Sequence, residues 1–169
     1  LYGAARRGRC RMQLVAAEAK PIPDFKDAVK THRAAWNILL KDSEGPDDGH
    51  LFSRLRGEEG LAASLEDSVF WMVQLMEAWF LADIDALRRF YGQGFLEARL
   101  PGNPKVEEIP KQDVLDRLKR ATETTTKGAY HKTHHAPRLL ERINPELVKP
   151  AAPNCRRLFE VVLAGLTAA

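Results

Sequence analysis

Two short apolar runs stop abruptly, and each is typical of a buried β-strand. The first, residues 36–41, ends at an acidic turn over 42–48 that glycine and proline interrupt. A strand that stops at such a turn is typical of α/β proteins. The second run, 68–75, continues directly into 76–83 and 84–91, where apolar residues recur at helical spacing. We therefore expect two strands, the second followed at once by helix.

The remaining pattern predicts one further strand and several helices. Residues 11–17 predict a short strand, and 24–32 predict a helix with Asp24 as its N-cap. A Gly- and Pro-containing loop over 92–110 precedes helices predicted at 111–121, at 135–143, from Asn144-Pro145 onward and at 155–166. We predict a single α/β domain over 1–169, with an α/β core at 11–91 and a helical extension at 92–169 packed on it.

Length and composition exclude several protein classes. A chain of 169 residues suits one domain, and 44% hydrophobic with 29% charged residues is a globular composition rather than a disordered one. No apolar run approaches the roughly 20 residues that span a bilayer, and residues 1–12 lack the apolar segment of a secretory signal. Cys10 and Cys155 are too few for a disulfide framework, and we expect one surface and one buried thiol. These features predict a cytoplasmic protein.

The net charge of +3 hides an uneven distribution. Residues 1–35 carry a balance of +5, residues 36–98 a balance of −7, and residues 99–169 again +5. Converging acids beside a basic rim would suit metal ions and a polyanion together. The alternative is that these charges only decorate solvated faces.

Three acids are candidate metal ligands. Asp42 and Glu44 follow the first strand at positions i and i+2, so in extended geometry their carboxylates point the same way. Glu77 lies two residues past the second strand, and it reaches the same sheet edge if the strands are parallel neighbours. Such a trio could hold a metal ion such as Mg²⁺, which would polarise a phosphodiester and activate water. The alternative is an ordinary acidic turn and a glutamate that caps a helix.

A basic, histidine-containing segment follows at 127–135. A helix through it would place His131 and His135 on one face, and both are donors to anionic oxygen together with Lys127 and Lys132. We expect these four residues to bind phosphate groups of nucleic acid. The alternative is a solvated loop that leads into a helix. The aromatic residues Trp71, Trp79, Phe80 and Phe90 are most simply core residues.

Several stretches together resemble a known family. They are Ile-Leu-Leu-Lys-Asp-Ser-Glu-Gly-Pro at 38–46, Met-Val-Gln-Leu-Met-Glu-Ala-Trp-Phe-Leu-Ala-Asp at 72–83, Leu-Pro-Gly-Asn-Pro-Lys-Val-Glu-Glu-Ile-Pro-Lys at 100–111, Lys-Gly-Ala-Tyr-His-Lys at 127–132, His-Ala-Pro-Arg-Leu-Leu-Glu-Arg-Ile at 135–143 and Arg-Arg-Leu-Phe at 156–159. The chain resembles, from about residue 10 to its end, the bacterial and phage domain-of-unknown-function family 4276. That family has a Toprim-like core and is found in genomes beside OLD-type ATPases.

The resemblance implies a Toprim-like open, mainly parallel sheet whose strand-end acids bind Mg²⁺ for nicking or strand transfer in nucleic acid. Asp42 and Glu44 are similar to the Asp-x-Asp element of Toprim domains, and Glu77 is an additional acid of this family. Toprim domains begin with a strand ending in Glu-Gly, and no such sequence stands before residue 11. We therefore expect the chain to lack that strand and its catalytic glutamate.

Two functions follow from these expectations. One is a Mg²⁺-dependent, nuclease-like protein that acts on nucleic acid in phage defence with an OLD-type ATPase partner. The other is a non-catalytic interaction module that keeps the fold and binds a protein or nucleic acid. The absent Glu-Gly strand favours the second, whereas the three acids and the basic segment favour the first.

Overall fold

The fold is described for residues 20–168 of a computed structural model. The strand expected at 11–17 and the thiol of Cys10 lie outside the described residues. Along the described part of the chain the elements are α1 (Pro21–Thr31), β1 (Leu39–Asp42), α2 (Leu51–Glu59), η1 (Ala63–Ser68), β2 (Val69–Met72), η2 (Met76–Ala82), α3 (Ile84–Tyr91), η3 (Glu97–Arg99), η4 (Val106–Glu108), α4 (Lys111–Thr122), α5 (Lys132–Leu140), α6 (Pro145–Ala151) and α7 (Pro153–Ala168), where η marks a 3₁₀ helix.

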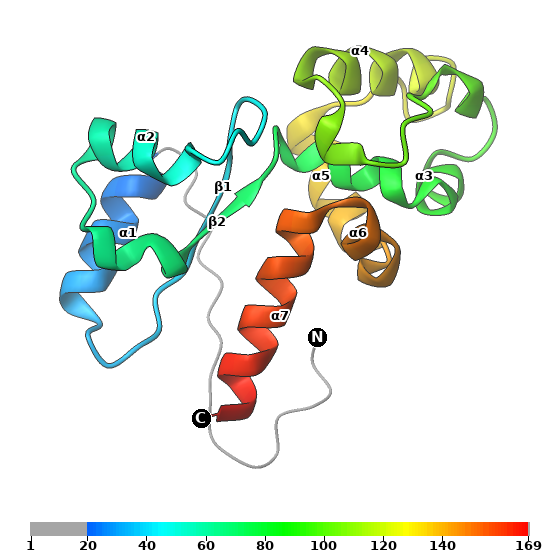
Figure 1. The fold of residues 1–169 in the computed structure, drawn as a ribbon. Coiled ribbons are helices and arrows are strands. Elements are labelled where there is room, and N and C mark those ends of the chain that lie inside the picture. Colours follow the sequence, from blue (N-terminus) through cyan, green and yellow to red (C-terminus); the bar gives the residue numbers. More distant parts are fainter. Residues whose placement is uncertain (1–19, 169) are drawn as a thin grey trace.

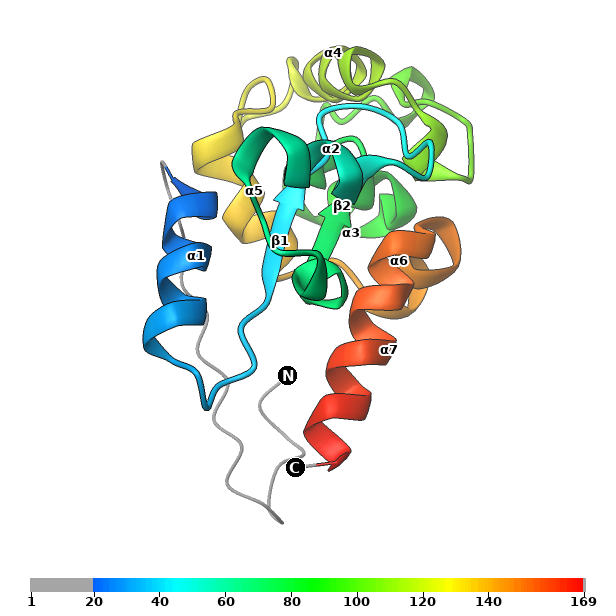
Figure 2. The ribbon, with the colours of Figure 1, turned by 60° about the vertical axis from the view of Figure 1, so that its left-hand side comes forward.

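The two expected strands pair side by side and run parallel, as Figure 2 shows. Leu39 lies opposite Val69, and Asp42 lies opposite Met72. Both strands are shorter than the apolar runs that predicted them, and Trp36, at the start of the first run, is 47% exposed. The chain is thus an α/β protein with a small parallel sheet, and both strands end at the same edge.

One face of this sheet is covered by α1 and α2. Their apolar side chains form a core with the sheet that consists of Ile22, Phe25, Leu39, Leu51, Leu55, Leu61, Val69, Trp71 and Val73. The sequence predicts Asp24 as the N-cap of α1, but the N-cap is Lys20. The helix starts earlier because Pro21 and Pro23 occupy its first turn, where a missing N–H costs nothing and the fixed φ suits the helix.

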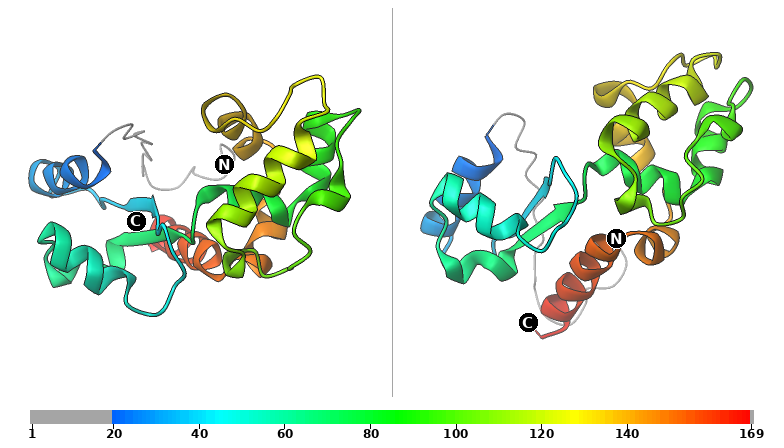
Figure 3. Two further views of the ribbon diagram at one scale, coloured as in Figure 1. Left: turned by 90° about the horizontal axis from the view of Figure 1, so that it is seen from above. Right: turned by 45° about the horizontal axis from the view of Figure 1, so that its top comes forward.

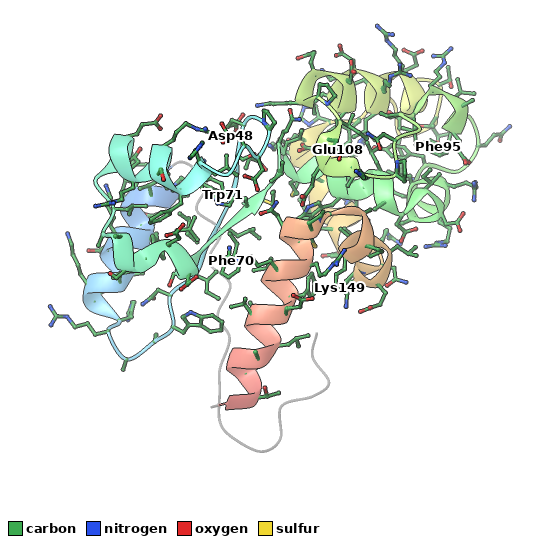
Figure 4. The ribbon with its side chains drawn as sticks, viewed as in Figure 1. Asp48, Phe70, Trp71, Phe95, Glu108 and Lys149 are labelled. Atoms are coloured by element: carbon green, nitrogen blue, oxygen red, sulfur yellow. The ribbon has the colours of Figure 1, made fainter. Side chains whose placement is uncertain are left out.

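The opposite face of the sheet packs on α7. Neighbouring residues of a strand point to opposite sides, so Trp71 faces α2 while Phe70 faces α7 (Figure 4). The guanidinium of Arg157, on α7, stacks 4.9 Å from the Phe70 ring, and its Nη1 donates to the Val69 carbonyl at 3.4 Å. The sheet is therefore a thin layer between helices.

Helices α3 to α6 gather beyond the ends of the strands, at the other end of the molecule (Figures 1 and 3). They enclose a second core with η2 and the start of α7, in which Trp79, Phe80 and Phe90 are buried as expected, and so is Cys155. Asn144 is the N-cap of α6, as expected, and its side chain accepts from the Glu146 N–H at 3.0 Å. None of the described helices is long and apolar enough to cross a membrane.

Candidate functional site

Asp42 is the last residue of β1, and its carboxylate is directed toward the segment that follows β2. Its Oδ1 accepts a hydrogen bond from the backbone N–H of Met76 at 2.8 Å. Met76 is the first residue of η2, where a backbone N–H has no partner within the helix. Because this bond links residues 34 positions apart, it fixes the carboxylate at the common edge of the two strands.

Glu77, the second residue of η2, is completely buried. Its Oε1 accepts from the Tyr130 hydroxyl at 2.8 Å, whereas its Oε2 has no hydrogen-bond partner among the described residues. Burial raises the pKa of Tyr130, and the charge of Glu77 raises that pKa further, so the hydroxyl keeps its proton. Tyr130 therefore remains a donor to this carboxylate.

Lys132 brings the two carboxylates together. It is the first residue of α5, and its Nζ lies 3.2 Å from Asp42 Oδ2 and 3.7 Å from Glu77 Oε1. Partial burial lowers the pKa of Lys132, but the negative charges of Glu77 and Asp42 outweigh that effect, so the net pKa shift is upward. Two carboxylates, one from the end of β1 and one from η2, thus converge on one cationic nitrogen, and we refer to them as the Asp42–Glu77 pair.

Glu44 forms its ion pair with a different base, although its charge is near enough to raise the pKa of Lys132. It has a φ of 64°, in the left-handed region, so the extended geometry expected for 42–44 is wrong. Its backbone N–H donates to the Gln74 carbonyl at 2.9 Å, while its carboxylate forms an ion pair with Lys111 at the start of α4. Within residues 20–168, no three His, Cys, Asp or Glu side chains gather closely enough to form a metal-binding group.

His131 and His135 also differ from the arrangement that the sequence predicted. His131 precedes α5 as its N-cap, so it does not share a helical face with His135 as expected. His135 is buried, and its Nδ1 lies 3.0 Å from the Tyr91 hydroxyl and accepts from the His131 backbone N–H at 3.2 Å. Burial lowers the pKa of His135, and neighbouring positive charges lower it further. His135 is therefore a neutral residue that supports the start of α5.

The positive charges around His135 form an exposed surface. His131, His134, Arg138 and Lys127 are exposed, and each lies near enough to His135 to lower its pKa by electrostatic repulsion. The His131 and His134 rings are 4.6 Å apart. We call these four residues the cationic surface. Lys132, one residue from His131, connects this surface to the Asp42–Glu77 pair.

The sequence interpretation missed the role of Tyr130. This residue stands in the Lys-Gly-Ala-Tyr-His-Lys stretch at 127–132, two positions before Lys132. A signal was available, because the stretch carried part of the family resemblance and contains one aromatic hydroxyl. Its partner could not be identified, since Glu77 is 53 positions away in the chain.

The comparisons with known proteins identify a family without assigning an activity. The model of a family described as a domain of unknown function (DUF4276) matches residues 7–163. No curated protein and no solved structure gives a significant match. Because the match extends over most of the sequence, the chain belongs to the DUF4276 family.

Proposed function

Since the family description leaves the activity open, we propose a function from the site: a Mg²⁺- or Mn²⁺-dependent, Toprim-type protein that cuts or transfers phosphodiester bonds in nucleic acid. The observation that carries this proposal is the convergence of the Asp42 and Glu77 carboxylates within 4 Å of one cationic nitrogen. A place that holds an ammonium ion between two carboxylates has the charge that a divalent cation requires.

The residues at this edge fit a hard divalent cation. Mg²⁺ is commonly held by one or two carboxylates, with water and phosphate oxygens completing its coordination. Asp42 and Glu77 supply two carboxylates, and Glu77 Oε2 is a buried oxygen with no partner within residues 20–168. An unpaired buried carboxylate oxygen is costly, and a cation would satisfy it. Glu44 stands apart with Lys111, so in this proposal Asp42 and Glu77 are the principal ligands.

In this proposal the side chains have distinct roles. When bound, a divalent cation supplies Lewis-acid polarisation of a phosphodiester and activation of water. Asp42 stays in position through the Met76 N–H, and Glu77 stays in position through the Tyr130 hydroxyl. Burial of Glu77 excludes solvent from one side of the pair, which strengthens its attraction for a cation.

The cationic surface is the proposed contact for the nucleic acid backbone. Of the four residues expected to bind phosphate, Lys127 and His131 are exposed on it, and Lys132 connects it to the pair. His135 is buried beneath it and contributes by holding the start of α5. Arg138 takes the place of His135 at the surface, since it is exposed and close enough to affect the pKa of His135. Guanidinium groups suit phosphate because they present paired donors.

Nicking of supercoiled plasmid in the presence of Mg²⁺ or Mn²⁺ tests the proposal. We expect activity that requires the metal and that falls at least about 100-fold in Asp42→Asn, since loss of a metal ligand removes several kcal/mol of transition-state stabilisation. Asp48→Asn is the matched control. Asp48 lies in the same acidic loop (Figure 4), but it pairs with exposed Arg54.

Equal activity in the wild type and Asp42→Asn, or none in either, contradicts this function. Absence of both activity and metal binding would instead favour the interaction module, in which Lys132 is a permanent counter-ion of the pair. The OLD-type ATPase partner and a role in phage defence stay predictions from the family resemblance.

A further inference from the structure

The place that the proposed function assigns to a metal ion is held by a side chain of the protein itself. The Lys132 ammonium lies 3.2 Å from Asp42 Oδ2 and 3.7 Å from Glu77 Oε1. Two positive ions this close together in a partly buried site repel each other strongly. A divalent cation and Lys132 therefore cannot both occupy the space between these carboxylates.

The two carboxylates are the fixed parts of this arrangement. Asp42 Oδ1 is bound to the Met76 N–H at 2.8 Å, and Glu77 Oε1 is bound to the Tyr130 hydroxyl at 2.8 Å. Their side chains are 17% and 0% exposed, respectively, so packing also restricts them. Each carboxylate is thus held by a hydrogen bond that does not involve Lys132.

Lys132 is the part that can move. Its side chain is 59% exposed, it stands at the first position of α5, and its long aliphatic chain reaches the pair from the solvent side. It can swing into solvent without unfolding the helix, because among the described residues its ammonium contacts only the carboxylates of Asp42 and Glu77. Beside it lies the cationic surface, where Lys127, His131 and His134 are also exposed.

We infer that Lys132 is an internal counter-ion that a divalent cation displaces, and that the released ammonium then contacts the phosphate backbone of the nucleic acid substrate. This inference rests on the proposed function, because it requires a metal at the Asp42–Glu77 pair. It assigns two positions to one residue: between the carboxylates before the cation binds, and on the substrate afterwards. In the first position Lys132 neutralises buried Glu77, with which no other basic side chain of residues 20–168 forms an ion pair.

Calorimetric titration with Mn²⁺ gives the first test. Removal of a competing internal ligand raises the apparent affinity, because the metal no longer has to displace it. We expect Lys132→Met to bind Mn²⁺ about tenfold more tightly than the wild type. Lys105→Met is the control, because Lys105 forms an exposed ion pair with Glu108 and its loss should leave Mn²⁺ affinity unchanged.

Amine labelling of the wild-type protein gives a second test that does not depend on the folding of a variant. Acylation of each lysine is followed by mass spectrometry with and without saturating Mn²⁺. We expect the labelling rate of Lys132 to rise several-fold when Mn²⁺ is added, since displacement exposes its ammonium. The rate at Lys105 should stay constant.

The outcomes separate this inference from the proposed function. If Mn²⁺ binds but neither the affinity in Lys132→Met nor the labelling of Lys132 increases, the counter-ion role is wrong and the metal site stands. If Mn²⁺ binds neither protein, the metal site itself is wrong, and the counter-ion role is overturned with it. Tighter binding together with faster labelling supports both.

Discussion

Two glutamates are buried in the described part of the chain, and their surroundings differ. Glu107, in η4, has both carboxylate oxygens occupied at the start of α7: the backbone N–H of Asn154 lies 3.1 and 3.3 Å from them, and its side-chain Nδ2 lies 3.1 Å from Oε2. Glu77 has one hydroxyl donor and one more distant ammonium, and its Oε2 has no partner. Both side chains are thus buried, but only Glu107 has a hydrogen-bond donor on each of its carboxylate oxygens.

This difference in hydrogen bonding indicates a structural role for Glu107 and makes Glu77 a candidate for function. Glu107 accepts hydrogen bonds at the N-terminus of α7, where backbone N–H groups have no partner within the helix. Such an arrangement is complete by itself. Glu77 faces a second acid, Asp42, across the Lys132 ammonium, and its Oε2 has no hydrogen-bond partner among the described residues. A buried carboxylate that the fold leaves incompletely satisfied is a common feature of ligand sites.

The largest expected effect is a difference in Mn²⁺ affinity between two variants, in each of which one of these glutamates is replaced by glutamine. Glu77→Gln removes one of the two negative charges at the proposed metal site, so Mn²⁺ affinity should fall about 100-fold or more, which corresponds to about 3 kcal/mol. Glu107→Gln should bind Mn²⁺ as the wild type does, because Glu107 accepts hydrogen bonds at the start of α7 and does not contact the proposed metal site. Calorimetric titration of both variants measures the contrast.

Circular dichroism should confirm that both glutamine variants are folded before their affinities are compared. Equal loss of Mn²⁺ binding in the two variants would mean that the effect follows from damage to the fold. Unchanged binding in Glu77→Gln would remove Glu77 from the proposed site.

A smaller effect is expected when a donor to each carboxylate is removed. Tyr130→Phe deletes the hydroxyl that holds Glu77 and should lower the free energy of unfolding by about 2 kcal/mol, since bonds to charged groups contribute that much. It should also weaken Mn²⁺ binding about tenfold, as is usual when a partner of a metal ligand is lost. Urea denaturation and calorimetry provide these two values.

Asn154→Ala is the matched change at Glu107. It removes the Nδ2 donor but keeps the backbone N–H, so we expect a cost of about 1 kcal/mol and no change in Mn²⁺ affinity. If Tyr130→Phe alters stability alone, Tyr130 supports the fold without positioning Glu77 for the metal.

The sequence predicted the edge at which the site lies, because that part depends on local patterns. Apolar runs ending at 41 and 75 indicated two strands, and parallel pairing at Leu39–Val69 through Asp42–Met72 confirms that Asp42 and the start of η2 share an edge. The Toprim-like classification stays a prediction. The positions of helices were also accessible, since their apolar spacing and the Asn144 cap are local signals.

The contacts within the site could not be predicted, because they join distant parts of the chain. Lys132 reaches Asp42 across 90 positions, and Tyr130 reaches Glu77 across 53. Glu44 was misplaced for a different reason: its left-handed backbone breaks the alternation on which the i, i+2 argument depended. The burial of His135 could not be predicted either, because it depends on packing against Tyr91, a residue of another helix.

The smallest expected effect is a dependence of stability on pH that Glu107 causes. The neighbouring Glu108 provides the control. Burial raises the pKa of Glu107 above the ordinary value of 4.5, despite the hydrogen bonds from Asn154 that lower it. The folded protein therefore holds this proton more tightly than the unfolded chain. The resulting stabilisation is complete below pH 4.5 and is lost as the pH rises through the raised pKa. Relative to Glu107→Gln, the wild type should thus become more stable as the pH falls from 7 to 4.

Glu108 should show the opposite sign, because the hydrogen bond from Lys105 lowers the pKa of this exposed carboxyl. Its contribution is present above the ordinary pKa and is lost as the pH falls, so the wild type should lose stability relative to Glu108→Gln toward pH 4. Urea denaturation of the three proteins at pH 4 and pH 7 measures both differences, and groups common to all three cancel. A Glu107 difference that shrinks toward pH 4 would mean that its bonds to Asn154 outweigh its burial, and that Glu107 is held as a charged cap of α7.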